Sequence, residues 1–335
     1  MIASPNGRRP GLPDLAPLYA VILVWLALVL ITLPTWRDLW RVWSGNVIFH
    51  HGPVVLLVAI AMILHRLRHL PGAAPVIGPL GWLPAAVVSW GWFAAWLADI
   101  DIGMHLAAIL LLAGAVPAMV GWPMAWRMRF PLFYLLLAVP AGLSLIAPLQ
   151  RLTADLAVGL LDLMEIAHLR DRFVIELMTP QGLARFSIEA ACSGIRYLFA
   201  SLAVGLLFAH VAARRPVRRM AVTAVFIIVP VLANALRAAG IVALAAAIGA
   251  ARANAIDHRL YGEIFFLITL GLSFALAIPW TERRSRKDRS ASPIPLPPAG
   301  SLRSLPWPAI ARYLIAAALG PALALAWQGV FFPTS

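Results

Sequence analysis

The chain has 335 residues, of which 62% are hydrophobic and 12% charged, and its mean hydropathy is +0.86. Soluble domains carry about 25% charged residues, so this composition excludes a soluble enzyme and indicates a polytopic helical membrane protein. The net charge of +13 does not indicate nucleic-acid binding, because the basic residues gather in short loops between apolar runs, as the positive-inside rule expects. The lipid bilayer is therefore an expected partner, and nucleic acid is not.

The N-terminal half predicts five membrane spans. Residues 1–17 are a polar leader, and the apolar run at 18–33 predicts a helix that stays in place, because no small-residue cleavage site follows it. The next four predicted spans cover residues 53–64, 80–98, 102–121 and 130–148. The His- and Arg-rich segment at 65–69 is expected to be a solvated anchor at a helix end rather than a metal site.

The segment at 149–191 is more polar than its surroundings. Leucines alternate with acidic residues at helical spacing over 151–169, which predicts an amphipathic helix lying on the membrane interface. Two short runs rich in β-formers, 172–178 and 183–189, flank the turn sequence Thr-Pro-Gln-Gly and predict a β-hairpin. The hairpin is either a connector or an edge that receives an extended peptide as an added strand.

The C-terminal half predicts four more spans, at 192–210, 220–248, 258–280 and 309–327, with a Pro- and Ser-rich cytoplasmic linker at 281–308. The predicted fold class is thus an all-α polytopic membrane protein with about eight to nine transmembrane helices. With the arginine-dense loops in the cytoplasm, sixteen Lys and Arg residues lie inside and eight outside. This orientation places the helix and hairpin of 149–191 on the extracytoplasmic side.

Cys192 is the only cysteine, and it lies where the polar segment meets an apolar helix. A single cysteine excludes an internal disulfide, a two-thiol redox relay and a cysteine-based metal site, and no cofactor is expected. The thiol is either a buried, inert group or a nucleophile. A position at a helix N-terminus favours the nucleophile, because the helix dipole stabilises a thiolate there.

Arg237 lies inside an apolar run, where a charge is costly and indicates a functional residue by default. Counted from Met220 at the inner end, it lies about 25 Å along the helix and so in the outer half of the membrane. Asn234, three residues earlier, shares its helical face and is placed to hold the guanidinium. Arg237 otherwise neutralises a buried acid or lines a polar pore.

His258 begins the eighth predicted span, after Asp257 and shortly before Tyr261. Alone it indicates a cap or surface group, but Cys192, Arg237 and His258 all fall toward the same leaflet. Together they supply a nucleophile, a proton-transfer group and a cation for a developing oxyanion, which are the requirements of acyl transfer. Arg196, four residues after the cysteine and on its face, is the rival for the cationic role.

Three sequence blocks resemble the signature blocks of the exosortase/archaeosortase family, and they occur in the family's order. They are Glu-Ala-Ala-Cys-Ser-Gly-Ile-Arg-Tyr-Leu at 189–198, Asn-Ala-Leu-Arg-Ala at 234–238, and Asp-His-Arg-Leu-Tyr-Gly at 257–262. The resemblance implies that the catalytic Cys, Arg and His are Cys192, Arg237 and His258. The supporting residues expected around them are Ser193, Gly194, Arg196, Asn234, Asp257 and Tyr261.

The resemblance implies a membrane-embedded cysteine transpeptidase in the cytoplasmic (inner) membrane of a bacterium, with its active site on the extracytoplasmic side. Its partners would be secreted proteins that end in a sorting signal, made of a Pro-Glu-Pro-like motif, a hydrophobic helix and a basic tail. Many relatives belong with exopolysaccharide biosynthesis. The exosortase-like domain is expected at 18–280, with the catalytic part at 149–280.

Two features lie outside this resemblance. Relatives often place Glu two residues before the cysteine, whereas this chain has Ala190 there and Glu189 three residues before. The C-terminal helix and tail at 309–335 are either a remnant of an accessory domain or an anchor. The alternative function, from another class, is a non-catalytic membrane subunit or transporter with Arg237 lining a substrate path, although no paired halves are visible in the sequence.

Overall fold

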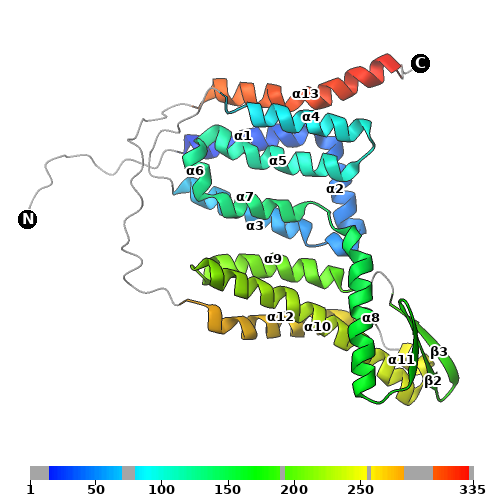
Figure 1. Cartoon of the computed structure of the whole chain (residues 1–335). Helices are drawn as coiled ribbons and strands as arrows, with labels where there is room; N and C mark the ends of the chain where they lie inside the picture. Colours follow the sequence, from blue (N-terminus) through cyan, green and yellow to red (C-terminus); the bar gives the residue numbers. More distant parts are fainter. Residues whose placement is uncertain (1–14, 70–79, 189–192, 255–257, 283–304, 332–335) are drawn as a thin grey trace, which may run out of the picture. The chain divides into compact units, whose positions relative to one another are not determined.

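The computed structural model describes residues 15–69, 80–188, 193–254, 258–282 and 305–331. Among these residues, seven helices are long and apolar enough to cross a bilayer, and eight if the bent pair at the N-terminus counts as one span. The predicted class, an all-α polytopic membrane protein, is confirmed (Figure 1). The predicted number of about eight to nine agrees with this count at eight. The individual spans differ, because α4 (Leu83–Leu97) and the segment Arg129–Ala138 are apolar but short, whereas Leu143–Leu163 is long enough to count.

The chain divides into two compact units. The first takes its described residues from 1–46, 52–140 and 290–335, and the second from 47–51 and 141–289. The helices of the first unit are α1 (Ala16–Ile31), α2 (Leu33–Gly45), α3 (Gly52–Arg68), α4, α5 (Asp101–Val120), α6 (Trp122–Arg127), α7 (Arg129–Tyr134) and α13 (Trp307–Phe331).

Helix α13 packs closely on α4 and α5 in the first unit. The Ser89 hydroxyl donates to the carbonyl of Ala317 (2.7 Å) and accepts from the backbone N–H of Gly320 (2.8 Å). Tyr313 is only 1% exposed, and its hydroxyl donates to the Leu111 carbonyl at 2.7 Å. The last helix is therefore an integral part of this unit's core, although it lies more than 180 residues from α5 in the sequence.

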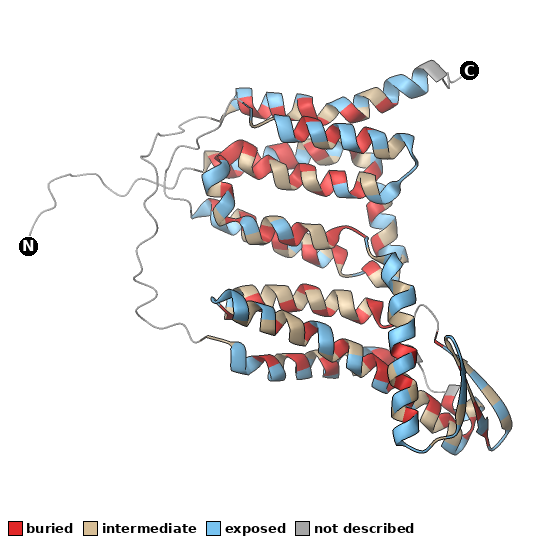
Figure 2. Ribbon diagram, viewed as in Figure 1, coloured by how far each residue is buried: buried red, intermediate tan, exposed pale blue. Residues whose placement is uncertain are grey.

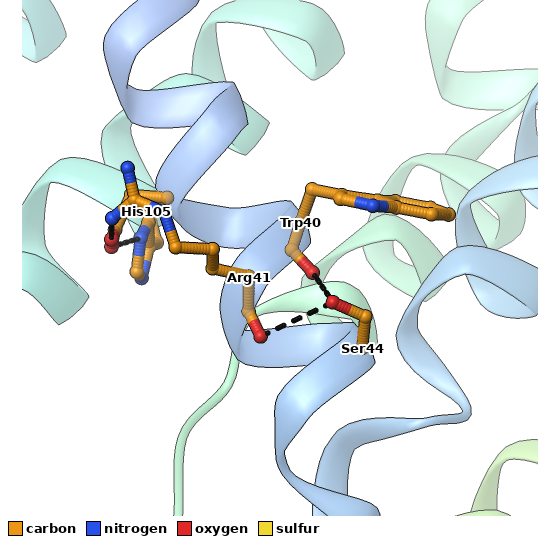
Figure 3. A network of polar contacts seen from close by, with 5 residues as sticks. Trp40, Arg41, Ser44 and His105 are labelled. Atoms are coloured by element: carbon orange, nitrogen blue, oxygen red, sulfur yellow. Dashed lines mark hydrogen bonds and ion pairs between the residues drawn. The ribbon is translucent and has the colours of Figure 1, made fainter.

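Helix α2 lies between the first two predicted spans, in a segment for which no helix is predicted. It is bent by 85° from α1, and it buries Thr35, Leu39 and Trp43, which share one face at four-residue spacing. Asp38 accepts from the buried His105 of α5 (2.9 Å) and from Arg41 (3.0 Å), and Ser44 donates to the Trp40 carbonyl (Figure 3). Asp38 of α2 thus provides the hydrogen-bond acceptor for the buried His105 of α5. This contact and the buried apolar face together favour a helix in this charged stretch.

The predicted fifth span, 130–148, is interrupted. Helix α7 continues as a short 3-10 helix, η2 (Leu135–Ala138), and the chain then leaves the helix at Val139 and Pro140. Gly142 has a φ of +94°, and η3 (Leu143–Leu145) leads from it into α8 (Ile146–Leu163). Proline removes a backbone donor and the left-handed glycine turns the chain, so one continuous helix cannot form here.

The second unit contains three neighbouring helices: α9 (Ile195–Ala212), α10 (Pro216–Ile248) and α12 (His258–Ala277), with short helices α11 (Ala250–Asn254) and η5 (Ile278–Trp280). Helix α10 packs against both α9 and α12. Helix α8 runs across the direction of these helices (Figure 1), with one face buried and the other exposed (Figure 2). The predicted amphipathic helix is thus present, but it covers 146–163 rather than 151–169, and by length and composition it also counts among the helices able to cross a bilayer.

The predicted hairpin is present and carries a third strand. Strands β1 (His168–Asp171), β2 (Val174–Thr179) and β3 (Gly182–Ser187) form an antiparallel sheet in the order β1-β2-β3, with Thr179 paired to Gly182. Ile175 and Leu177, which point from the same face of β2, join a buried cluster with Leu161 of α8 and Val242 of α10. The sheet is thereby fixed on the C-terminal part of α10.

Candidate active site

Three elements of the second unit meet at one level of α10. A Cβ atom added to Gly194, at the start of α9, would lie 2.8 Å from the Asn234 amide carbon on α10. A Cβ atom added to Gly262, in the first turns of α12, would lie 2.7 Å from the Tyr197 hydroxyl and 4.0 Å from Nη1 of Arg237. Only glycine allows both approaches, so the beginnings of α9 and α12 lie directly beside the Asn234–Arg237 turn.

Arg237 is buried, with 7% of the residue exposed. Its Nη2 donates to Oδ1 of Asn234 at 3.4 Å, the contact that their helical spacing predicts, and Nδ2 of Asn234 donates to the Thr153 hydroxyl of α8 at 3.2 Å. Within the described part of the chain, no atom accepts a hydrogen bond from Arg237 Nε. A buried guanidinium that is positioned by an amide is suited to binding an anionic group.

Tyr197 lies close to both arginines of the site. The guanidinium carbon of Arg196 lies 4.7 Å from the centre of its ring, and that of Arg237 lies 5.8 Å from it, within the range of cation–π attraction. The ring also stacks on Phe266 of α12, with centroids 5.0 Å apart. Tyr197 therefore couples the positions of α9, α10 and α12.

Arg196 is held differently from Arg237. Its Nη2 donates to the Tyr197 hydroxyl at 2.8 Å, and its Nη1 lies 3.2 Å from a carboxylate oxygen of Glu263. Its side chain is 31% exposed and that of Glu263 is 54% exposed. The two arginines thus differ in environment: one is an ion-paired group at an accessible edge, and the other is buried against an amide.

A cavity of about 160 Å³ opens beside Arg196. Its walls come from the 47–51 segment, which includes the 3-10 helix η1 (Val47–Phe49), and from the first turns of α9 and α12. The lining residues are Val47, Ile48, His50, His51, Arg196, Tyr197, Ala200, Glu263 and Phe266. The cavity therefore combines an aromatic wall with basic and potentially basic side chains and one carboxylate.

The structure brings together only part of the predicted site. Arg237, Asn234, Arg196 and Gly194 lie around Tyr197, and Ser193 is buried next to Gly194. The predicted residues Cys192, Glu189 and Asp257 lie outside the described residues. His258 begins α12 and Tyr261 lies in its first turn, but their side chains are also outside the described part.

The sequence reasoning did not select Tyr197, Glu263, Thr153 or the cavity. Glu263 carried a usable signal, because an acidic residue in an apolar helix invites the same functional interpretation as Arg237. Tyr197 follows Arg196 directly, but its contact with Arg237 depends on packing between helices. His50 and His51 gave no signal, since they are about 145 residues from Arg196 in the sequence.

Together these observations define a multi-pass helical membrane protein in which a buried arginine and a more accessible one both lie close to one stacked tyrosine. The chain belongs to the transmembrane exosortase family (Exosortase_EpsH), whose sequence model matches residues 40–275. No curated protein and no solved structure matches the chain. Family membership indicates an exosortase-like function in a membrane.

Proposed function

We propose that the protein is a membrane cysteine transpeptidase that cleaves a C-terminal sorting signal from secreted proteins. The signal consists of a Pro-Glu-Pro-like motif, an apolar helix and a basic tail. The enzyme works at the extracytoplasmic side of the inner membrane, in connection with the export of surface proteins or exopolysaccharide. Family membership supports this proposal, and so do the three sequence blocks that contain Cys192, Arg237 and His258.

The observation that carries the proposal is the convergence of α9, α10 and α12 on Arg237. Gly194, which touches Asn234, follows Cys192 by two residues, and two residues of chain span at most about 7 Å. Gly262, which lies beside Arg237 Nη1, follows His258 by four residues, or about 6 Å along a helix. The described neighbours of both reactive residues therefore meet at the buried guanidinium.

The proposed reaction is acyl transfer through a thioester. The Cys192 thiolate attacks the scissile carbonyl carbon, and Arg237 stabilises the oxyanion that forms. The intermediate collapses with cleavage of the C–N bond, His258 protonates the departing amine, and a thioester to Cys192 remains. An acceptor nucleophile or water then attacks the thioester and releases the thiolate.

The test is co-expression with a tagged reporter that ends in this sorting signal. We expect the wild-type enzyme to shorten the reporter, and Cys192→Ala to lower its processing by at least about a thousandfold while the variant still accumulates in the membrane. Intact mass of the purified reporter gives the cleavage position. Normal shortening by the Cys192→Ala variant would refute the nucleophile, and shortening by neither protein would refute the proposed function.

A further inference from the structure

Of the three proposed reactive residues, only Arg237 has a described side chain, and it does not line the cavity beside Arg196. Tyr197 contacts both arginines: the two guanidiniums lie 4.7 and 5.8 Å from the centre of its ring, and its hydroxyl accepts from Arg196. A group bound in the cavity would therefore lie within one side chain of Arg237. This position is suited to a substrate side chain near the scissile bond.

The charges of the cavity favour an anion. Arg196 contributes a guanidinium with five N–H donors, and the imidazoles of His50 and His51 also line the cavity. Among the described residues of the lining, Glu263 is the only one with a carboxylate, and it is already paired with Arg196. Since the Glu263 side chain is more than half exposed, it is free to turn into water when another carboxylate takes its place on Arg196.

The size and wall of the cavity favour a peptide side chain over a larger anion. About 160 Å³ accommodates one carboxylate side chain and part of a neighbouring residue. The faces of Tyr197 and Phe266, stacked at an interplanar angle of 13°, offer an apolar wall for that neighbour. A lipid phosphate headgroup needs no such wall.

We infer that the cavity is a carboxylate subsite in which Arg196 binds an acidic side chain of the substrate close to the scissile bond. Glu263 occupies Arg196 while the subsite is empty and competes with the substrate. This inference rests on the proposed function, and it assigns Arg196 to substrate selection rather than to the oxyanion. It also explains why the chain keeps two arginines in one site.

The competition between Glu263 and the substrate gives the two residues opposite effects. Arg196→Gln removes the anion-binding group and should lower kcat/KM for an acidic reporter by about ten- to a hundredfold, mainly through KM. Glu263→Gln removes the competitor and should lower KM for the same reporter. If the ion pair only held the helices together, both variants would lose activity.

The experiment compares two reporters, one with Glu in its sorting motif and one with Gln, in proteoliposomes that contain wild type, Arg196→Gln, Arg196→Lys or Glu263→Gln. We expect wild type to prefer Glu by tenfold or more, Arg196→Gln to lose this preference, and Arg196→Lys to retain part of it. The matched control is the Arg170–Asp155 pair, whose exposures of 27% and 59% resemble those of Arg196 and Glu263. Arg170→Gln should keep the preference.

Three results would overturn the inference. An active wild type that processes both reporters equally would refute the subsite and leave the proposed function standing. Equal losses for both reporters in Arg196→Gln would show a structural role only. An Arg196 effect that follows the fraction of anionic lipid, rather than the reporter's charge, would assign the cavity to a phosphate headgroup.

Discussion

Gly262 provides a direct test of the geometry around Tyr197. Its missing side chain leaves room for the Tyr197 hydroxyl, because an added Cβ would lie only 2.7 Å from that oxygen, whereas ordinary contacts begin at 3.4 Å. In Gly262→Ala the hydroxyl must therefore move by about 0.7 Å. The ring cannot turn freely, since it is buried and stacked on Phe266, so the hydrogen bond from Arg196 is disrupted.

A hydrogen bond to a charged group contributes about 1.5–3 kcal/mol, which corresponds to about ten- to a hundredfold in rate or affinity. We therefore expect Gly262→Ala to lower kcat/KM for the acidic reporter by this factor. The matched control is Gly271→Ala on the same helix, where an added Cβ meets no atom within 4 Å. That change should leave processing unaltered and stabilise α12 by up to about 1 kcal/mol.

The assay is the initial rate of reporter shortening in proteoliposomes, normalised to the amount of enzyme. Both variants should accumulate in the membrane like wild type. Equal rates for Gly262→Ala and Gly271→Ala would refute the role assigned to the Tyr197 hydroxyl.

Three further variants test other contacts. Asn234→Ala removes the acceptor that positions Arg237 and should lower the processing rate about tenfold or more. The control is Gly240→Ala on the same helix, where an added Cβ meets no atom within 4 Å, and equal rates for the two variants would contradict the role of Asn234. Gly194→Ala must adopt a φ of +78°, which costs about 1–2 kcal/mol, and also pushes on Asn234, so its thermal midpoint in detergent should fall; an unchanged midpoint would argue against the strain. Tyr313→Phe loses one buried hydrogen bond and should lower the stability by about 1 kcal/mol without altering processing, and a loss of processing at unchanged stability would contradict this.

Much of the fold could be predicted because hydropathy and helical periodicity are local properties. They predicted α9, α10 and α12, as well as the amphipathic α8 and the β2–β3 hairpin. The same reasoning missed α2. Its Asp38 binds His105 of α5, which is 67 residues away in the sequence, and no local pattern reveals such a contact. The same reasoning also predicted one continuous span over 130–148. The helix is in fact interrupted at Pro140 and Gly142, because proline lacks a backbone donor and Gly142 has a left-handed φ.

For the site, the sequence predicted which residues carry the chemistry (Cys192, Arg237 and His258) and that they fall toward one leaflet, but not how their surroundings pack. The contact of Arg237 with Asn234 followed from helix geometry. The stacking of Tyr197 on Phe266 and the cavity with His50 and His51 depend on how separate helices pack. The proposal that Arg237 rather than Arg196 stabilises the oxyanion likewise rests on their different burial and partners.

The length of α10 makes membrane thickness a variable for this protein. Its 33 residues span about 50 Å, whereas the hydrocarbon layer is about 30 Å thick, so roughly 20 Å of the helix projects beyond it. Arg237 lies about 32 Å from the first residue of α10, so if an untilted helix enters the lipid at Pro216, the arginine is close to the level at which the helix emerges again. Longer acyl chains would bring this level into the lipid and shorter ones would expose it to water, so hydrophobic mismatch changes the solvation of the arginine without altering a single protein contact.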